Sequence, residues 1–427
     1  MTKKGFLFLV LIAFMAVALV VGGCAEEGAA PETEPENGEE TEGEGPVEDK
    51  DVLVFGGARS LTGPLAIQDE SCFGPVYRMW ADEVNARGGI YVEEYGKQLP
   101  VELKIYDDTS DMGTMTRLLE KLMVEDQVDF LLAPISTAFL HAAAPICNEH
   151  GYLLMGAEGG AKELEPMMAG LPYFFSVLNY ATHQVPALVD MLVENEIESV
   201  AIIFIADQHG IEYSGDTIPL LEMNGIDVAF SKSVPLGIDD MSALINEAKE
   251  ADVDAVLCYA YPDENFLMVG QSIEMDFNPD MMLFGPGVCF EVFHDIFGPA
   301  TEGVMGWGAW NEKSSPEAAD LVQRITEHEG SRNIDWWGQV PYYAGLQILE
   351  QAIEMSGTID HEVLKDVIAT EKFDTVMGEV WFENGGIPAE CYPGQIGQWQ
   401  NGIFEVVAPA DQATAEPIIP KPAWPGQ

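Results

Sequence analysis

From residue 51 onward, short apolar runs of strand length alternate with longer stretches whose apolar residues recur every three or four positions. Such a change of period distinguishes strands from amphipathic helices. Strands are predicted over 52–57, 101–108, 128–135 and 152–157, and helices over 73–89, 115–126 and 138–151. Because parallel strands are usually joined through a helix, this alternation predicts a parallel, doubly wound α/β sheet.

The same alternation starts again after Phe174. Strands are predicted over 199–207, 228–236, 255–261 and 281–287, and helices over 183–195, 214–225, 241–251 and 266–275. The restart indicates a second α/β lobe rather than one continuous sheet. Later in the chain, a strong amphipathic pattern predicts a helix over 342–356, and segments 379–386 and 395–407 are expected as late strands with a hairpin between them. The Pro- and Ala-rich tail, 408–427, is expected to have no fold of its own.

The N-terminus has the pattern of an export signal. Lys3 and Lys4 precede an apolar stretch over 6–21, and small residues then lead to Cys24. This pattern predicts a lipoprotein signal over 1–24, with Cys24 as the lipidated first residue of the mature chain. The alternative is a plain transmembrane anchor. The apolar stretch is short for a span of about 20 residues, and the small residues before Cys24 have no role in an anchor.

Acidic residues dominate the composition. Residues 25–50 contain eleven acidic side chains and few apolar ones, so an extended, disordered tether is expected there. The whole chain has 72 acidic and 19 basic residues and a net charge of −53, and the tether accounts for only part of this excess. Such a charge argues against binding to nucleic acids or to anionic lipid surfaces.

Cysteine and histidine spacings indicate neither a metal centre nor a disulfide framework. Besides Cys24, five widely spaced cysteines remain, which are Cys72, Cys147, Cys258, Cys289 and Cys391. Export permits a single disulfide bond, and the sequence leaves open whether any pair forms one. No CxxC motif or histidine pair with metal-ligand spacing occurs, so no metal or cofactor is expected.

Asp107 and Asp108 follow a strand, where adjacent acids are more often turn formers than catalytic groups. With no paired base or nucleophile elbow, an enzyme is not expected.

A glycine-rich loop follows the first strand, in the sequence VFGGARSLTGPL over 54–65. Its glycines do not have the spacing of a dinucleotide fingerprint, and no Lys follows Gly63 as a P-loop requires. Ser60 and Thr62 instead offer hydroxyl groups near a helix N-terminus, which suits a small carboxylate or polar solute. The alternative interpretation is a plain strand-to-helix turn.

Several segments, in order, resemble one known family. GARSLTGPLA, ADEVNARGGI, LPVELKIYDDTSD, VDFLLAPISTAFLHAAAPICNEHGYLLMGAEGGAKEL and PYYAGLQILEQAIEMSGTID resemble the solute-binding proteins of branched-chain amino acid type ABC transporters. The resemblance covers roughly residues 52–405. It implies the periplasmic-binding-protein type I fold, in which two lobes are joined by three crossovers. The first lobe is expected over 51–176 and 308–373, the second over 177–307 and 374–407, and the crossovers near 174–180, 306–310 and 373–377.

The resemblance also implies a solute cleft between the lobes. It places contacts with the solute at Ser136, Thr137, Ala157, Glu158 and Gly160 in the first lobe, and at His209, Tyr261, Gly287 and Phe290 in the second. Ser60 and Thr62 are expected at the lip of the cleft. Gly287 stands where amino-acid binders usually have an acid, and Gln68 where they often have an aromatic residue. These departures argue against a plain leucine or valine ligand, and a carboxylate without an amine, an amide or a less common amino acid fits as well.

The function implied is that of an extracytoplasmic, lipid-anchored receptor that delivers a small solute to an ABC permease, with no catalytic step. A monomer is expected. The alternative is a sensory protein of the same fold, which reports the solute to a signalling partner.

Overall fold

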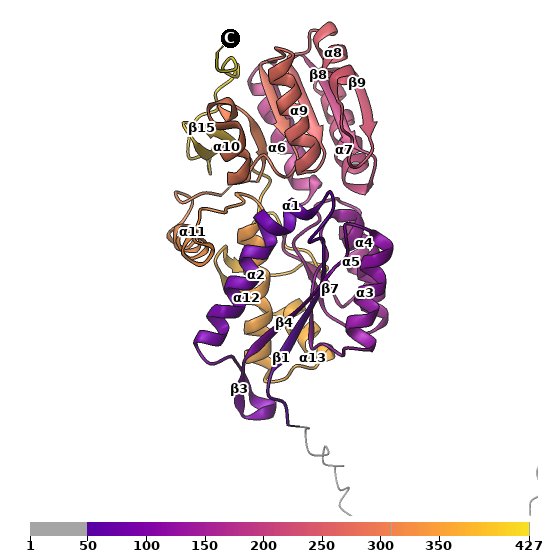
Figure 1. Ribbon diagram of the computed structural model, residues 1–427, viewed down its shortest axis with the longest axis vertical. Coiled ribbons are helices and arrows are strands. Elements are labelled where there is room, and N and C mark those ends of the chain that lie inside the picture. Colours follow the sequence, from indigo (N-terminus) through magenta and orange to yellow (C-terminus); the bar gives the residue numbers. More distant parts are fainter. Residues whose placement is uncertain (1–48, 309, 427) are drawn as a thin grey trace, which may run out of the picture. The chain divides into compact units, whose positions relative to one another are not determined.

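The computed structural model describes residues 49–308 and 310–426. The predicted signal segment with Cys24, and the predicted tether up to residue 48, lie outside the described residues. The described chain forms two α/β lobes, each built on one main sheet (Figure 1). The two lobes confirm the fold class that the alternating pattern and the family resemblance predict.

The first lobe has a parallel sheet with the strand order β4-β1-β5-β6-β7. Its strands are β1 (Leu53–Arg59), β4 (Val101–Asp107), β5 (Phe130–Leu132), β6 (Leu154–Gly156) and β7 (Phe174–Ser176). Helices α3 and α4 pack together on one side of the sheet, and α2 and α12 pack together on the other (Figure 1). Both faces are therefore covered, which is why β1, β5, β6 and β7 are mostly buried, whereas the edge strand β4 has charged residues and is only partly buried.

The helices of the first lobe are α1 (Ala66–Gln68), α2 (Gly74–Ala86), α3 (Met112–Val124), α4 (Thr137–Glu149), α5 (Leu164–Gly170), α12 (Gln339–Ser356) and α13 (His361–Thr370). A small hairpin, β2 (Ile90–Val92) and β3 (Lys97–Leu99), encloses the short helix η2 (Glu93–Tyr95). This hairpin, α5 and α13 have no counterpart in the sequence prediction. The strands of the hairpin and α5 are short, whereas α13 has a clear amphipathic pattern that the prediction did not include.

The second lobe has a seven-stranded sheet with the order β16-β15-β12-β11-β10-β8-β9. Its parallel strands are β8 (Ser199–Ile205), β9 (Asp227–Val234), β10 (Ala255–Tyr259), β11 (Met281–Phe284) and β12 (Met305–Trp307), and the antiparallel strands β15 (Ile396–Gln400) and β16 (Ile403–Ala408) complete it. Its helices are α6 (Ala181–Glu194), α7 (Gln208–Met223), α8 (Ser242–Glu250), α9 (Pro262–Glu274), α10 (Glu291–Phe297) and η3 (Gly298–Thr301). The expected hairpin between segments 379–386 and 395–407 is wrong. β14 (Gly378–Val380) pairs with β13 (Phe373–Thr375), whereas β15 and β16 pair with each other through a turn at Asn401 and Gly402.

The chain passes between the lobes three times. It crosses first after β7, at 177–180, and again after β12, through Gly308 and residues 310–315, before α11 (Pro316–Glu329) packs on α2. The third crossing lies later than the sequence predicts. The hairpin of β13 (Phe373–Thr375) and β14 (Gly378–Val380) packs on α12 of the first lobe, and Ser176 N–H then bonds to the Gly385 carbonyl at 2.9 Å. Residues 373–386 thus extend the first lobe, and the crossing falls at 387–395.

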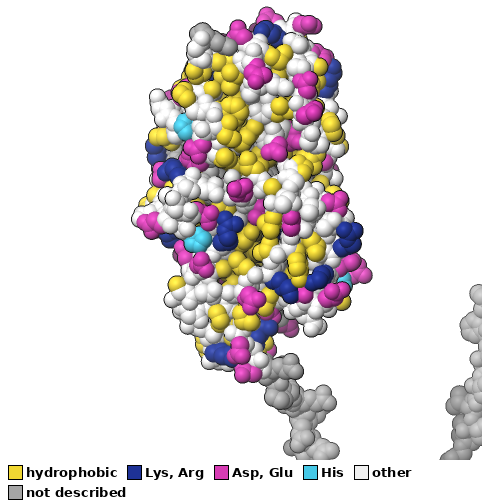
Figure 2. All heavy atoms as spheres, in the orientation of Figure 1, with side chains coloured by type: hydrophobic (Ala, Val, Ile, Leu, Met, Phe, Trp, Pro, Cys, Tyr) yellow, Lys and Arg dark blue, Asp and Glu magenta, His cyan; other side chains and the backbone are white. Residues whose placement is uncertain are grey.

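Acidic side chains are spread over the visible surface of both lobes (Figure 2). Several of them pair with the few basic residues, as Asp126 does with Lys104 and Lys121, both at 2.8 Å. Exposed pairs of this kind contribute little to the free energy of unfolding. Most of the negative charge is left without a basic partner, because the chain has 72 acidic residues for 19 basic ones.

The C-terminal tail is packed onto the second lobe although residues 409–426, all of them described, contain no helix or strand. Trp424 is buried, and its indole N–H donates to the Phe277 carbonyl at 2.9 Å. Lys421 N–H donates to the Asp280 carbonyl at 2.7 Å, and its ammonium group lies 3.3 Å from the centroid of the Trp424 ring. The tail therefore depends on the second lobe for its structure.

Replacing this anchor is expected to destabilise the protein. Trp424→Ala should lower the free energy of unfolding by about 3–5 kcal/mol, because it empties a buried indole site and leaves the Phe277 carbonyl without its donor. Urea denaturation followed by circular dichroism measures the change. Met223→Ala, at a position that is 80% exposed, is the control and should change stability by less than about 0.5 kcal/mol. A loss below about 1 kcal/mol for Trp424→Ala would contradict a structural role for the tail.

Candidate functional site

A buried cavity lies between the lobes, where the carboxyl ends of both parallel sheets meet. Such strand ends are the usual place for ligands in α/β folds. The cavity is lined by Gln68, Cys72, Phe73, Thr137, Ala157, Glu158, Gly160, Leu178, His209, Tyr261, Pro286, Phe290, Asp335, Trp337 and Gly338. Its volume is about 30 Å³, enough for about two water molecules. A solute the size of an amino acid therefore requires the lining side chains or the lobes to move.

The cavity brings together most of the residues predicted from sequence. Thr137, Ala157, Glu158 and Gly160 line it from the first lobe, and His209, Tyr261 and Phe290 line it from the second. Several of these positions are helix starts. Thr137 begins α4, while Tyr261 and Phe290 directly precede α9 and α10. Helix N-termini carry free N–H groups and partial positive charge, which favour a carboxylate or carbonyl oxygen.

Ser60 and Thr62 do not line the cavity. The Ser60 hydroxyl donates to Asp108 at 2.7 Å, and the Thr62 hydroxyl donates to Asp107 at 2.7 Å. These bonds fasten the glycine-rich loop to the end of the neighbouring strand, β4. The two aspartates therefore hold a turn, as expected, and the two hydroxyl groups predicted for the cleft are already engaged there.

Ser136 and Gly287 also lie beside the cavity rather than in its lining. Ser136 caps α4, with its hydroxyl 3.4 Å from Phe139 N–H, and it adopts a φ of +79°. Gly287 has a φ of +108°, and a Cβ atom there would lie 2.6 Å from the Cα of Pro262. Gly287 thus allows the β11–α10 loop to approach α9 closely, and no larger residue fits at this position.

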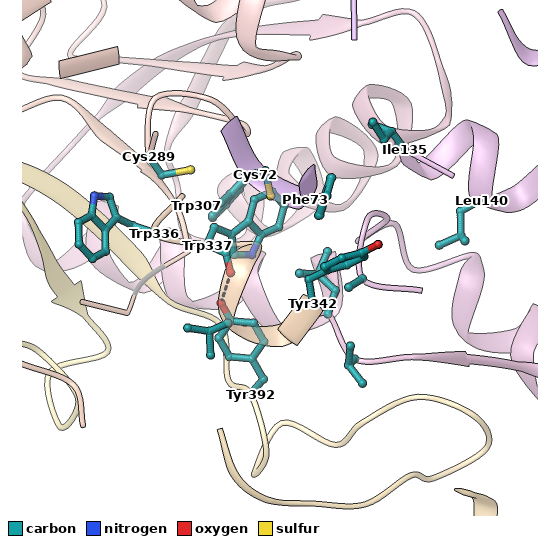
Figure 3. Close-up of a cluster of buried hydrophobic side chains, with 14 of the residues drawn as sticks. Cys72, Phe73, Ile135, Leu140, Cys289, Trp307, Trp336, Trp337, Tyr342 and Tyr392 are labelled. Carbon is teal, nitrogen blue, oxygen red and sulfur yellow. Dashed lines mark hydrogen bonds between the residues drawn. The ribbon is translucent and has the colours of Figure 1, made fainter. Parts of the chain in front are cut away.

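A π-helical turn, η1 (Asp69–Phe73), supplies lining residues that the sequence pattern does not identify. It lies between α1 and α2 in a continuous helical segment, and π-helical turns often occur at functional sites. Cys72 and Phe73 point into the cavity wall from this turn, beside Trp337 (Figure 3). Their contribution depends on the extra residue in the turn, which the apolar period of a helix does not reveal.

Arg59 organises the first-lobe side of the cavity, although it is not itself a lining residue. Its side chain is fully buried, and it donates to Asp69 at 2.8 Å, to Glu158 at 2.9 Å and to the Ala133 carbonyl. Its guanidinium carbon lies 5.3 Å from the ring centroid of Phe73, and the rings of Tyr77 and Tyr342 lie within 6 Å as well. A buried charge requires such partners. The sequence places Arg59 in the glycine-rich loop without indicating this role.

Two carboxyl groups line the cavity. Burial raises the pKa of Glu158 to about 7, against the opposing effects of Arg59 and the Ala157 N–H. Burial also raises the pKa of Asp335, although that group accepts hydrogen bonds from the thiols of Cys72 and Cys289 and from two backbone N–H groups at the start of α12. The hydrogen-bonding capacity of Asp335 is largely used, while each oxygen of Glu158 has one protein donor and keeps a free lone pair.

His209 and Gln68 each bring a polar atom without a protein partner. Burial lowers the pKa of His209 to about 4, so the ring is neutral near pH 7. It stacks on Tyr261 with ring centroids 5.4 Å apart, and its Nε2 atom has no hydrogen-bond partner. The Oε1 atom of Gln68 is likewise buried and unpartnered. Buried polar atoms are rarely left unpaired, so these two are candidates for contacts with a ligand.

Trp337 lies between the cavity and all three crossovers. Its indole N–H donates to Asn179 at 3.0 Å, and its carbonyl accepts from the Tyr392 hydroxyl at 3.0 Å (Figure 3). At Gly308, which has a φ of +94°, any Cβ atom would collide with the Trp337 side chain. Asn179, Gly308 and Tyr392 belong to the first, second and third crossovers respectively.

Direct contacts join the lobes beside the cavity. Glu163 N–H in the first lobe donates to Glu212 of α7 at 3.0 Å, and Lys162 forms an ion pair with Asp216. These bonds hold the lobes close together in the described conformation.

The sequence also raises the questions of a metal site, a disulfide bond and a membrane-spanning helix, and the described residues contain none of the three. No group of three or more His, Cys, Asp or Glu side chains in residues 49–308 and 310–426 is arranged to hold a metal ion. The five cysteines in these ranges are free thiols. No helix in the described part of the chain is both long and apolar enough to cross a membrane.

Comparison with known proteins agrees with this geometry. The family model described as periplasmic binding protein matches residues 53–402. The chain is 25% identical over 344 residues to the leucine-, isoleucine-, valine-, threonine- and alanine-binding protein of Pseudomonas aeruginosa, covering 79% of this chain and 87% of that protein. It is also 25% identical over 360 residues to a Leu/Ile/Val-binding protein homologue of Brucella suis, covering 82% and 91% respectively.

Solved structures show the same fold. A leucine-binding protein from Thermotoga maritima matches with a TM-score of 0.72 and 20% identity, covering 84% of this chain and 98% of that one. A solute-binding protein of an ABC transporter from Rhodopseudomonas palustris, in complex with 3,4-dihydroxybenzoic acid, matches with a TM-score of 0.72 and 17% identity, covering 83% and 95%. The relatives and the fold are those of solute-binding proteins and not of enzymes. The chain belongs to the periplasmic binding protein family.

Proposed function

We propose that this protein is an extracytoplasmic solute-binding lipoprotein of an ABC importer. It captures a small amino-acid-like, amide or carboxylate solute between its lobes and delivers it to a membrane permease as a monomer. The observation that carries the proposal is the interlobe cavity, whose lining contains a buried, unpartnered polar atom from each lobe, Gln68 Oε1 from the first and His209 Nε2 from the second. The amino-acid-binding relatives and the transporter-associated structures support the same role.

Closure around the solute follows from the arrangement of the lobes. The cavity has residues of both lobes in its wall, so a solute inside it makes contacts that exist only when the lobes are together. Those contacts favour the closed form by their differential free energy. In this proposal, the Thr137 hydroxyl and the free N–H groups at the start of α4 hold a carboxylate or carbonyl oxygen, a role supported by the position of Thr137 in the lining and at the start of that helix.

Binding is tested first by a thermal-shift screen of amino acids, amides, and aliphatic and aromatic carboxylates. For the solute found, Thr137→Ala should weaken binding by about 0.5–1.5 kcal/mol, the usual contribution of one neutral hydrogen bond. Isothermal titration calorimetry measures the change. Thr116→Ala, on α3 away from the cavity, is the matched control and should leave affinity unchanged. Equal affinities for Thr137→Ala and the native protein would remove Thr137 from the site.

The lipid anchor has its own test. Cys24→Ala should abolish incorporation of labelled fatty acid and move the exported protein from the membrane fraction to the soluble fraction, because the acylated thiol is lost. Fractionation followed by immunoblotting measures the distribution. Cys391→Ala, which changes a half-buried free thiol in the folded body, should leave both properties unchanged. Persistent labelling of Cys24→Ala would rule out Cys24 as the acylated residue.

A further inference from the structure

The wall of the cavity carries an excess of acidic groups. Among its lining residues, Glu158 and Asp335 are acidic and none is Lys or Arg. The nearest cation bonded to the wall is Arg59, and Arg59 is shared between Glu158 and Asp69. When both of these carboxyl groups are ionised, the buried cluster of Arg59, Asp69 and Glu158 has one more negative than positive charge. An uncompensated buried charge is costly, so the cluster favours either a proton or a second cation.

The remaining polar atoms in the wall are mainly acceptors. Gln68 Oε1 is an unpartnered acceptor, and each oxygen of Glu158 keeps one lone pair beyond the bonds from Arg59 and the Ala157 N–H. The neutral His209 ring has an unpartnered Nε2. A solute that brings N–H donors, or a positive charge, satisfies Gln68 Oε1 and the Glu158 oxygens, and His209 Nε2 accepts or donates according to the tautomer of its ring.

Aromatic rings complete the surroundings. Phe73, Tyr261, Phe290 and Trp337 line the same cavity. The faces of aromatic rings attract cations by about 0.5–2 kcal/mol, more strongly where water is excluded. A cationic nitrogen beside Glu158 therefore meets a carboxylate in a cavity with aromatic rings in its wall, whereas a second carboxylate there would be repelled.

We propose that the solute carries a positively charged nitrogen, which is held by Glu158 of the first lobe, and that its binding displaces a proton from Glu158. In this step the carboxyl O–H bond breaks, its electron pair stays on the carboxylate, and the proton passes to the solvent. The oxygen end of the solute lies towards Thr137 and the start of α4. The inference rests on the proposed function and narrows its solute class, because carboxylates and amides without a cationic nitrogen are then excluded.

The groups around Glu158 set the direction of the pH effect. Arg59 of β1 bonds to it, and Asp69 and Cys72 of η1 and Tyr342 of α12 lie near enough to influence its ionisation or be influenced by it. Burial holds the pKa of Glu158 at about 7 in spite of Arg59. A bound cation lowers this pKa, so binding at pH 7 should release about half a proton. Affinity should then rise about tenfold between pH 6 and pH 8, as the ionised fraction of Glu158 increases.

The first experiment compares matched probes by thermal shift and calorimetry. The probes are the common L-amino acids, glycine betaine and choline, each beside a counterpart without the charge, such as 4-methylpentanoate and N-acetyl-leucine for leucine, together with 4-hydroxybenzoate. Binding confined to probes with a cationic nitrogen supports the inference. Equal or tighter binding of an uncharged or nitrogen-free counterpart overturns it and leaves the proposed function intact. Failure of every probe, and of the wider screen, counts against the proposed function itself.

The second experiment measures proton release. Calorimetry of the best cationic probe with the native protein at pH 7, in phosphate and in Tris buffer, should give enthalpies that differ by about half of the difference between the protonation enthalpies of the two buffers, because about half a proton is released. Glu158→Gln should abolish both the proton release and the pH dependence and weaken binding at least tenfold at pH 8. Glu264→Gln changes a buried glutamate outside the lining and should retain all three properties. Absence of proton release from the native protein overturns the inference however the variants fold.

Discussion

The buried guanidinium of Arg59 is the interaction on which the first lobe's half of the site depends. Transferring such a charge out of water costs many kcal/mol unless partners surround it. Its partners come from η1, from the end of β5 and from the loop after β6, and the rings of Phe73, Tyr77 and Tyr342 enclose it. Because each of these segments must be in place to compensate one charge, Arg59 fixes their positions relative to one another at the cavity.

On the other side of the cavity, the second lobe contributes residues that do not take part in a buried charge cluster of this kind. His209 is neutral and stacks on Tyr261, whose hydroxyl donates to Asp207 at 2.9 Å. The two sides of the cavity are therefore chemically unequal, with ionisable groups concentrated in the first lobe and neutral polar and aromatic groups in the second. An open form would retain the charged half intact, since none of the partners of Arg59 comes from the second lobe.

Sequence reasoning identifies the two-lobe fold because the change between strand and helix periods repeats along the chain. It also places Thr137, Glu158, His209 and Tyr261 at the cavity, since these residues follow strand ends and a resemblance supplies their roles. Sequence reasoning does not identify contacts between segments that only the tertiary structure brings together. Ser60 and Thr62 bond to Asp107 and Asp108 on a neighbouring strand, a pairing that no local pattern contains. The third crossover lies late because β13 and β14 form a hairpin that packs on α12, and three-residue strands have no detectable period.

Asp335, Trp337 and Arg59 are missed for a related reason. Asp335 joins thiols that are 263 and 46 residues away in the chain, and the partners of Arg59 lie up to 99 residues away. The hydrogen bonds of Trp337 reach residues of the first and third crossovers. Trp337 thus lines the cavity and contacts all three crossovers, through its indole N–H at Asn179, its carbonyl at Tyr392 and its packing against Gly308. A ligand that displaces Trp337 therefore also disturbs contacts of the segments that join the lobes.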